Sequence, residues 1–394
     1  MKNLENFDLI RVFDTSALDR NIKKALKKFG EKLAVVIKSN SYGFGIEKTL
    51  PIFKKNKIKN YFCQDIIEAL NAKKILNDDS YIYTFAGVQN EQAKTFIDNQ
   101  IIPICVNLSQ LDYFNKEAGH KKQKPKVAIH FDTGMNRTGL SFEEVKELSQ
   151  NWEKYTSNLD VILYVSHLHS SYNKKDVANK IQIERFKKFT SMLPKCKCSL
   201  SATGGSFRLC PDFHFDMVRV GYGIYGMLRE MESIISVYAK ILQIRNVKKG
   251  EKIGYFGGWK ATKDMKIAVL NIGYKDGYSR SLSKSNKLFD RIRARLHSGA
   301  GFAKSYMVID KYKCPVVGII SMNNTMIDVS NVPEKILATH NWVEVIGNKA
   351  NIMDFREANG YIPCDLICSL TTPNPNAIDL SNIEFYKIKK ELKI

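Results

Sequence analysis

The sequence predicts an α/β fold class: a (β/α)8 TIM-like barrel followed by a mostly β C-terminal domain. Two observations lead to this prediction. Between residues 33 and 220, short apolar runs alternate with amphipathic stretches, a pattern typical of parallel βαβ units. After about residue 245, β-rich segments broken by Gly, Asn and Lys-Gly turns replace this alternation. The length of 394 residues suffices for one large barrel and a second, smaller domain.

Eight apolar runs are the candidate strands of the barrel. They are residues 33–38, 59–63, 80–86, 101–106, 126–132, 161–167, 197–202 and 216–220. Amphipathic stretches that predict helices lie between several of them, at residues 66–76, 90–99, 142–152 and 175–192. Eight βα units are the number that closes a TIM barrel. A doubly wound open sheet is the alternative, but no GxGxxG motif follows an early strand.

The pattern also predicts where the two domains meet. We expect the barrel over residues 10–245 and the β-rich domain over residues 246–394, together with the N-terminal residues 1–9. The β-rich segments are "VYAKILQIRNVKKGEKIGY", "DMKIAVLNIGY", "KCPVVGIISMNNTMIDVS" and "WVEVIG".

The net charge of +21 raises the question of a nucleic-acid partner. The 61 Lys and Arg residues are spread along the whole chain, and no helix-turn-helix, zinc-finger or RNA-binding motif accompanies them. We therefore expect a solvated basic surface rather than a nucleic-acid interface. No stretch approaches the roughly 20 apolar residues of a membrane span. The opening segment "MKNLENFDLI" has no apolar signal core, which favours a cytoplasmic protein that does not contact membranes.

Polar side chains follow several of the predicted strands. In a TIM barrel, functional residues lie at the carboxyl ends of the strands, where they meet at one mouth. Lys38 closes the first apolar run and Arg137 follows the fifth. His167 ends the sixth run, and Arg219 lies in the eighth. Taken alone, Lys38 could be a strand-end lysine whose ammonium reaches water. His167 and His169 share a strand face, but no third ligand is evident, so we expect no metal site.

A partly desolvated lysine can form a Schiff base with an aldehyde. The glycine-rich segments "SATGGS" and "VGYGIYG" can offer backbone N–H groups to a phosphate, and barrels commonly bind phosphate after strands seven and eight. The natural aldehyde for a reactive lysine beside phosphate-binding loops is pyridoxal 5'-phosphate. We therefore expect this molecule as the cofactor.

Six strings, in order along the chain, resemble the alanine racemase family over roughly residues 8–376. They are "AVVIKSNSYGFG", "DTGMNRTG", "VRVGYGIYG", "GEKIGYFG", "IGYKDGYSR" and "GIISMNNTMIDVS". The resemblance implies a barrel that binds pyridoxal phosphate, a second β-domain, and a head-to-tail homodimer whose active sites are shared between subunits.

The resemblance also implies catalytic roles, carried over position by position. Lys38 matches the Schiff-base lysine, which is also the base for one face of the substrate. Tyr255 matches the base for the opposite face, supplied by the partner subunit. His167 matches the histidine beside that second base, and Arg219 matches the arginine that faces the pyridine nitrogen.

The cofactor and the substrate have larger expected sets. From the resemblance and the glycine-rich segments, the expected cofactor-binding residues are Lys38, Tyr42, Arg137, Thr203, Gly204, Ser206, Arg219, Gly221 and Tyr222. For the substrate, the resemblance implies Arg137 and Met322 at the carboxylate and Tyr274 at the entrance.

The implied activity is racemisation of an amino acid, most directly L- and D-alanine, with D-alanine supplied for cell-wall peptidoglycan. The chemistry fits, because racemisation removes a proton from one face of Cα and returns one to the other, which an amine and a phenol on opposite faces can do. The alternatives are a racemase of broader or different specificity, such as serine or lysine, or a related barrel decarboxylase. A non-catalytic protein that binds the cofactor or nucleic acid is the remaining alternative.

Several positions depart from the family pattern. His130 stands where the family usually has a lysine, Thr203-Gly204 where it has Asn-Ser, and Asn323 where it has an aspartate. The segment "PNPN", residues 373–376, replaces Arg-Val-Pro-Arg. An extra stretch of about 20 residues lies within residues 281–310 and contains Arg291, Arg293, Arg295 and His297.

Overall fold

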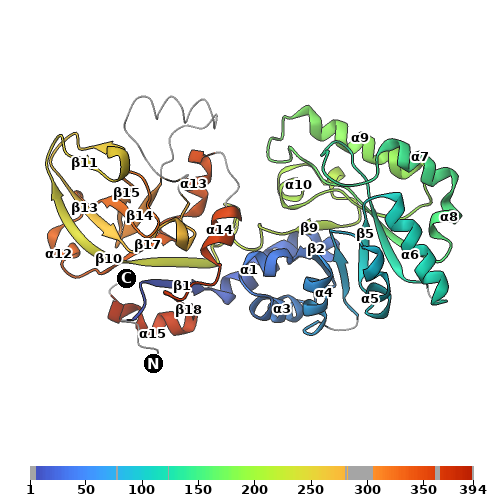
Figure 1. The fold of residues 1–394 in the computed structure, drawn as a ribbon, viewed down its shortest axis with the longest axis horizontal. Helices are drawn as coiled ribbons and strands as arrows, with labels where there is room; N and C mark the ends of the chain where they lie inside the picture. Colours follow the sequence, from blue (N-terminus) through green and yellow to red (C-terminus); the bar gives the residue numbers. More distant parts are fainter. Residues whose placement is uncertain are drawn as a thin grey trace. The chain divides into compact units, whose positions relative to one another are not determined.

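The computed structural model describes residues 6–76, 79–122, 124–279, 282, 305–359 and 364–392. The chain folds into two compact units (Figure 1). One, the barrel unit, spans residues 19–224, and the other, the β unit, combines residues 1–18 with residues 225–394. None of the helices within the described ranges is both long enough and apolar enough to span a membrane. The basic stretch with Arg291, Arg293, Arg295 and His297 lies outside the described residues.

The barrel unit contains eight parallel strands, one in each of the eight predicted runs. They are β2 (Leu33–Val36), β3 (Asn60–Cys63), β4 (Tyr81–Thr84), β5 (Ile102–Cys105), β6 (Lys126–His130), β7 (Asp160–Val165), β8 (Lys197–Ser199) and β9 (Val218–Val220). Their order is β8-β7-β6-β5-β4-β3-β2-β9, and a parallel bridge between Ala202 and Arg219 joins the two ends. The predicted barrel is therefore confirmed.

Helices surround these strands (Figure 1). They are α1 (Thr15–Phe29), α2 (Lys38–Tyr42), α3 (Ile46–Lys55), α4 (Ile66–Lys73), α5 (Ala93–Asp98), α6 (Leu108–His120), α7 (Phe142–Gln150), α8 (Trp152–Thr156), α9 (Val177–Ser191) and α10 (Thr203–Arg208), with the short 3-10 turns η2 (Gly30–Lys32), η3 (Asn90–Gln92) and η4 (Pro211–Phe213). Side chains cap the N-termini of several helices. At α4, Asp65 accepts a hydrogen bond from Glu68 N, and at α7, Ser141 forms a capping box with Glu144. Strands such as β2 and β5 are buried throughout, because the barrel interior covers one face and helices the other.

The β unit is built on one large sheet. Its strands are β1 (Leu9–Phe13), β10 (Ile235–Val247), β13 (Met265–Leu270), β14 (Tyr306–Ile309), β15 (Tyr312–Pro315), β16 (Thr325–Asp328), β17 (Trp342–Ile346) and β18 (Ala377–Ser381), and a separate hairpin pairs β11 (Lys252–Ile253) with β12 (Trp259–Lys260). The other elements are η5 (Tyr255–Gly257), η6 (Tyr274–Asp276), α12 (Glu334–Leu337), α13 (Ile352–Asn359), α14 (Cys364–Leu370) and α15 (Asn382–Leu392). The predicted mostly β architecture is confirmed, and α12, α13, α14 and α15 are additions that the sequence pattern did not predict.

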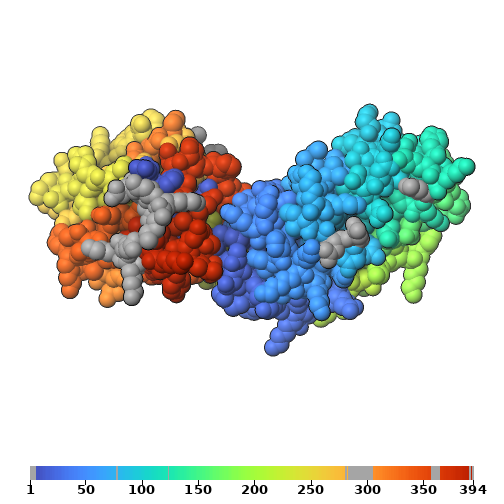
Figure 2. Space-filling model, turned by 90° about the horizontal axis from the view of Figure 1, so that it is seen from below, coloured from blue at the N-terminus to red at the C-terminus, as the bar shows by residue number. Residues whose placement is uncertain are grey.

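Strand β10 organises this unit. Its first half pairs with β1 and β17, and its second half pairs with β13. Strand β1 also pairs with β18, so the two ends of the chain share a sheet, and dark blue N-terminal atoms lie among red C-terminal ones in Figure 2. The boundary expected from the sequence, between residues 245 and 246, falls inside β10.

Candidate active site

Lys38 lies two residues beyond the end of β2, at the end of the barrel where all the parallel strands end, which we call the mouth. Its side chain is half-buried, and its Nζ atom lies 5.9 Å from the centre of the Phe85 ring, which follows β4. A cation over an aromatic face is held by the quadrupole of the ring. Lys38 is therefore placed inside the mouth rather than extended into water.

The segment labelled α2 is a left-handed turn after Lys38 and not a right-handed α-helix. Four successive non-glycine residues, Ser39 to Tyr42, have φ values between 52° and 56°. Such a conformation costs about 1–2 kcal/mol for each L-residue. It is held by the hydrogen bond from Ser41 N to Ile37 O (2.8 Å) and by that between the Ser41 and Thr49 hydroxyls (2.7 Å). Strain of this kind is concentrated at functional sites.

This turn buries Tyr42 and directs its hydroxyl to the last strand of the barrel. A Cβ atom on Gly221, which follows β9, would lie 2.2 Å from the Tyr42 oxygen. Only glycine therefore allows the backbone and the phenol to approach this closely. Two predicted cofactor residues, 179 positions apart in the sequence, are thus brought together.

Arg219 on β9 is the largest charged side chain in the barrel interior, with an exposed fraction of 2%. Its Nη1 donates to Ser199 O (2.7 Å) and Ser199 Oγ (2.5 Å), and its Nη2 donates to Ser166 O (2.6 Å). Burial lowers its pKa to about 9, so the guanidinium remains charged at neutral pH. These contacts fix a permanent cation and hydrogen-bond donor at the mouth.

Two histidines lie beside this cation. The pKa of His167 is lowered to about 3, first by burial and then by the charges of Arg219, Arg137, His130 and Lys38. The pKa of His130 is lowered to about 4, again by burial first and then by Arg219 and Arg137. Both imidazoles are therefore neutral near pH 7. His130 ends β6, His167 lies two residues beyond β7, and Arg219 lies one residue before the end of β9, so the three share the mouth.

Arg137 is carried by a loop that a single carboxylate organises. The Asp132 Oδ1 atom accepts hydrogen bonds from the backbone N–H groups of Gly134 (2.9 Å), Met135 (2.8 Å) and Asn136 (3.1 Å). The base of the loop is closed by Leu140 N, which donates to His130 O (2.7 Å). Arg137 itself is exposed at the tip. The loop therefore presents a cation to the mouth on an ordered backbone.

The glycine-rich segment at the start of α10 packs against the loop after β9. Gly221 N donates to Thr203 Oγ1 (3.0 Å), and Ser206 Oγ donates to Thr203 O (3.2 Å). A Cβ on Gly204 would lie 2.4 Å from Ser171 Oγ, so a side chain at this position would require the Ser171 hydroxyl to move. The Tyr222 hydroxyl is buried and has no hydrogen-bond partner among the described residues. A buried orphan hydroxyl beside a glycine cradle fits a bound phosphate.

The remaining predicted residues belong to the β unit. Tyr255, Tyr274 and Met322 have exposed fractions of 63%, 39% and 54%. Tyr274 N donates to Ser321 O (3.0 Å), so Tyr274 and Met322 are neighbours on this unit. The structure thus brings Lys38, Tyr42, Arg137, His167, Arg219 and the glycine segments together in the barrel unit, and leaves Tyr255, Tyr274 and Met322 on the surface of the other.

Two residues at the mouth were not singled out from the sequence. Phe85 lies under Lys38, and Gln182 on α9 contacts the backbone of His167. Phe85 lies next to the end of the predicted strand 80–86, which is the signal that could have revealed it, whereas a glutamine on a helix carries none. No group of three or more metal-ligating side chains occurs among the residues that the structure describes.

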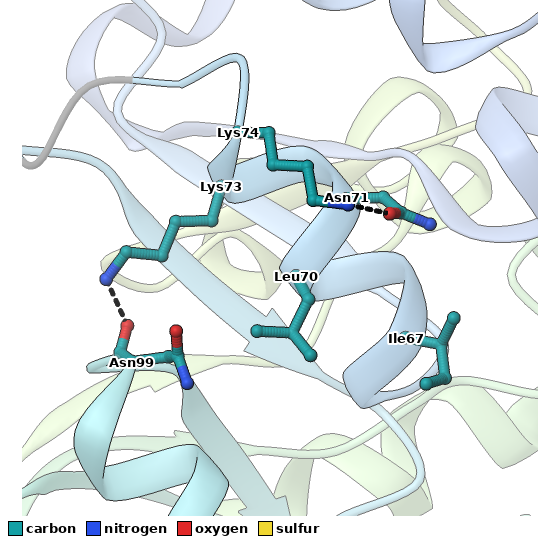
Figure 3. A pocket seen from close by; sticks show the side chains of 6 residues that line it. All are labelled: Ile67, Leu70, Asn71, Lys73, Lys74 and Asn99. Carbon is teal, nitrogen blue, oxygen red and sulfur yellow. Dashed lines mark hydrogen bonds between the residues drawn. The ribbon is translucent and has the colours of Figure 1, made fainter.

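Two surface pockets of the barrel unit contain none of the predicted residues. The one in Figure 3, about 460 Å³ in volume, lies between α4 and α5; Lys73 donates to Asn99 O there, and Lys74 donates to Asn71 Oδ1 (3.0 Å). The second, about 690 Å³, is lined by Tyr81, Ile102 and Lys126 at the starts of β4, β5 and β6. Both are separate from the mouth.

Comparison with known proteins places this geometry in a family. The family described as "Alanine racemase, N-terminal domain" matches residues 13–229, and "Alanine racemase, C-terminal domain" matches residues 234–378. The alanine racemase of Rhizobium meliloti is 30% identical over 91% of this chain and 93% of its own length. The biosynthetic alanine racemase of Agrobacterium fabrum is 28% identical over 91% and 90%. The Bartonella henselae alanine racemase structure, with covalently bound pyridoxal phosphate, has 25% identity and a TM-score of 0.81 over 95% of this chain and 99% of its own. The chain therefore belongs to the alanine racemase family.

Proposed function

We propose that this protein is a pyridoxal 5'-phosphate-dependent racemase that interconverts L- and D-alanine. The observation that carries the proposal is the placement of Lys38, Arg137, His167 and Arg219 at the carboxyl ends of barrel strands, with a phosphate-compatible cradle beside them. The bound cofactor of the Bartonella relative supports the choice of cofactor. The name of the Agrobacterium relative supports a biosynthetic role, in which D-alanine supplies peptidoglycan.

The residues that would hold the cofactor phosphate are Tyr42, Thr203, Gly204, Ser206, Gly221 and Tyr222. In this proposal the Tyr222 hydroxyl finds its missing partner in a phosphate oxygen. Lys38 would hold the aldehyde carbon. When bound, pyridoxal phosphate withdraws electron density from the substrate Cα and so acidifies its hydrogen.

The chain's own residues would then move the proton. The Lys38 amine removes or returns it on one face of Cα, and the Tyr255 phenol of a second copy does so on the opposite face. The Arg137 guanidinium and the Met322 N–H bind the carboxylate, and Tyr274 narrows the entrance. Because this division of labour needs Tyr255 from a second copy, the proposal includes a homodimer with shared sites.

Arg219 controls which chemistry follows. A guanidinium that stays protonated donates a hydrogen bond to a ring nitrogen without transferring its proton. An unprotonated ring nitrogen would be a weaker electron sink, so the arginine would favour return of the proton by the chain's own bases over side reactions. The contacts with Ser199 and Ser166 keep this donor in place.

The test is hydrogen exchange at Cα. Purified chain with pyridoxal phosphate is incubated in D₂O with L- or D-alanine, serine or lysine, and exchange, enantiomer ratio and CO₂ are followed by NMR, chiral chromatography and gas release. We expect exchange and interconversion of alanine, and loss of both in Lys38→Ala. Lys126→Ala, at the opposite end of the barrel, is the control. Release of CO₂ without interconversion, or no exchange with any of the three amino acids, would contradict the proposal.

A further inference from the structure

Helix α9 presents a buried polar face to the two loops that carry Arg137 and His167. Asn179 and Gln182, with exposed fractions of 3% and 1%, lie one helical turn apart, and the exposed Arg185 follows at the same spacing. Arg185 Nη1 donates to Thr133 O (3.3 Å), in the Arg137 loop. Asn179 Nδ2 donates to Asn173 O (2.9 Å), in the segment after β7. Gln182 lies between them and contacts both loops.

Both polar atoms of the Gln182 amide form hydrogen bonds with one stretch of backbone. Its Nε2 donates to His167 O (3.0 Å), and its Oε1 accepts from His169 N (3.1 Å). The side chain therefore pairs with residues 167–169 as a neighbouring strand would. A longer contact, from Nε2 to Thr133 Oγ1 (3.4 Å), ties the same amide to the Arg137 loop.

A buried chain of hydrogen bonds continues from this point to Arg219. The hydroxyls of Thr133 and Ser166 share a hydrogen bond of 2.8 Å, and Ser166 O accepts from Arg219 Nη2 at 2.6 Å. The exposed fractions of Thr133, Ser166 and Arg219 are 0%, 1% and 2%. Such a buried network is rigid when complete and relaxes when one member is lost.

We propose that Gln182 is a positioning residue of the racemase site: it holds the His167 backbone at a set distance from the Arg137 loop and supports Arg219 through Thr133 and Ser166. This inference rests on the proposed function. The role needs a donor and an acceptor on one side chain, which an amide supplies. An apolar residue of the same shape would leave the part-buried His167 carbonyl and His169 N–H without their side-chain partner, so the segment would shift.

The test uses Gln182→Met, which keeps the shape and removes both groups. Its matched control is Asn115→Leu on α6. Asn115 has an exposed fraction of 5% and also uses both ends of its amide, from Nδ2 to Lys154 O (3.1 Å) and from Asn158 N to Oδ1 (2.8 Å). Those partners lie just before β7, at the opposite end of the barrel from the mouth. A purely structural role for buried amides predicts equal effects of the two changes.

We expect both variants to melt at a lower temperature than the wild type. Only Gln182→Met should lower kcat by about tenfold or more in both directions, with KM for alanine within about threefold, because misplaced catalytic groups act mainly on the chemical step. Its primary isotope effect with Cα-deuterated alanine should rise as proton transfer becomes slower. Its affinity for pyridoxal phosphate, followed by absorbance, should fall about fivefold, because Arg219 loses support.

The outcomes separate the two proposals. An unchanged isotope effect, with activity reduced only in proportion to folded protein, would overturn the role of Gln182, and so would equal losses of activity in the two variants. If the wild-type chain does not racemise alanine, the proposed function fails. The comparison of cofactor affinity between the two variants then still decides whether Gln182 positions the site.

Discussion

At the scale of single residues, burial among cations sets the charge of the two mouth histidines. The pKa values of His167 and His130 are lowered to about 3 and about 4. In the unfolded chain a histidine has a pKa near 6.5. Between these values the unfolded state binds more protons than the folded one, so the free energy of unfolding falls as the pH drops below about 6.5.

Replacing either histidine should weaken this dependence. In His167→Asn or His130→Asn, the free energy of unfolding should decline less steeply from pH 6.5 to pH 5, by at most about 1.4 kcal/mol per pH unit for each histidine. Urea unfolding at several pH values measures this slope. His120→Asn, which removes an exposed histidine on α6, is the control. A slope identical to that of the wild type would contradict the prediction.

Gly221 gives a second prediction at this scale. In Gly221→Ala the new methyl group would lie 2.2 Å from the Tyr42 oxygen and 3.3 Å from Val36 Cβ, so the phenol must move. We expect about tenfold weaker binding of pyridoxal phosphate, measured by absorbance titration. Adding Tyr42→Phe removes the clashing oxygen, so the double variant should lose less affinity than the sum of the two single changes. Strict additivity would show that the two residues do not meet.

At the scale of elements, the site depends on loops whose conformations are costly. The left-handed turn after β2 and the loop after β6 are both held by contacts outside regular secondary structure. The first positions Lys38 and Tyr42, and the second presents Arg137. A change in the residue that organises such a loop should therefore weaken ligand binding more than it destabilises the fold.

Asp132 tests this for the Arg137 loop. Asp132→Ala removes the acceptor of three backbone N–H groups, so we expect KM for alanine to rise about tenfold while kcat changes less. Asp132→Asn keeps one acceptor oxygen, so its KM for alanine should lie between those of the wild type and Asp132→Ala. Asp328, whose carboxylate accepts from Ser330 N (3.0 Å) in the β unit, supplies the control variant Asp328→Ala. An equal rise in KM in both alanine variants would argue against a local role.

At the scale of the whole molecule, the proposed bases lie in different units. Lys38 belongs to the barrel unit, and Tyr255 is exposed on the β unit. In a dimer with shared sites, a mixed pair of Lys38→Ala and Tyr255→Phe subunits has one site with both defects and one site with none. Such a pair should be active although each parent is not.

Refolding a mixture of the two inactive variants should therefore restore activity. Random pairing makes about half of the dimers mixed, each with one intact site, so we expect about one quarter of the wild-type activity. The mixture is assayed for alanine racemisation, and each variant refolded alone is the control. No recovery in a mixture shown to contain mixed dimers would indicate that Lys38 and Tyr255 act from the same subunit.

The parts of this molecule that could be predicted from sequence are those with local signals. Strands such as β2 and β5 are buried on both faces, so their sequences are continuously apolar and could be located. Motifs located Lys38, Arg137 and Arg219. The left-handed turn of Ser39 to Tyr42 could not be foreseen, because its residues carry side chains that disfavour that conformation and only tertiary contacts hold it.

The sequence by itself determined the barrel, the β-rich second unit, the family, and the chemistry that an amine at a strand end can perform. Only the tertiary structure decided how that chemistry is held in place. It showed the bridge between Ala202 and Arg219 that closes the barrel, and the hydrogen bonds from the Arg219 guanidinium to Ser199 and Ser166. It also showed that the Gln182 amide hydrogen-bonds to the backbone of both His167 and His169. The physical reason is range: periodicity and motifs report neighbours along the chain, whereas Arg219 and Ser166 are 53 residues apart and meet only when the barrel closes.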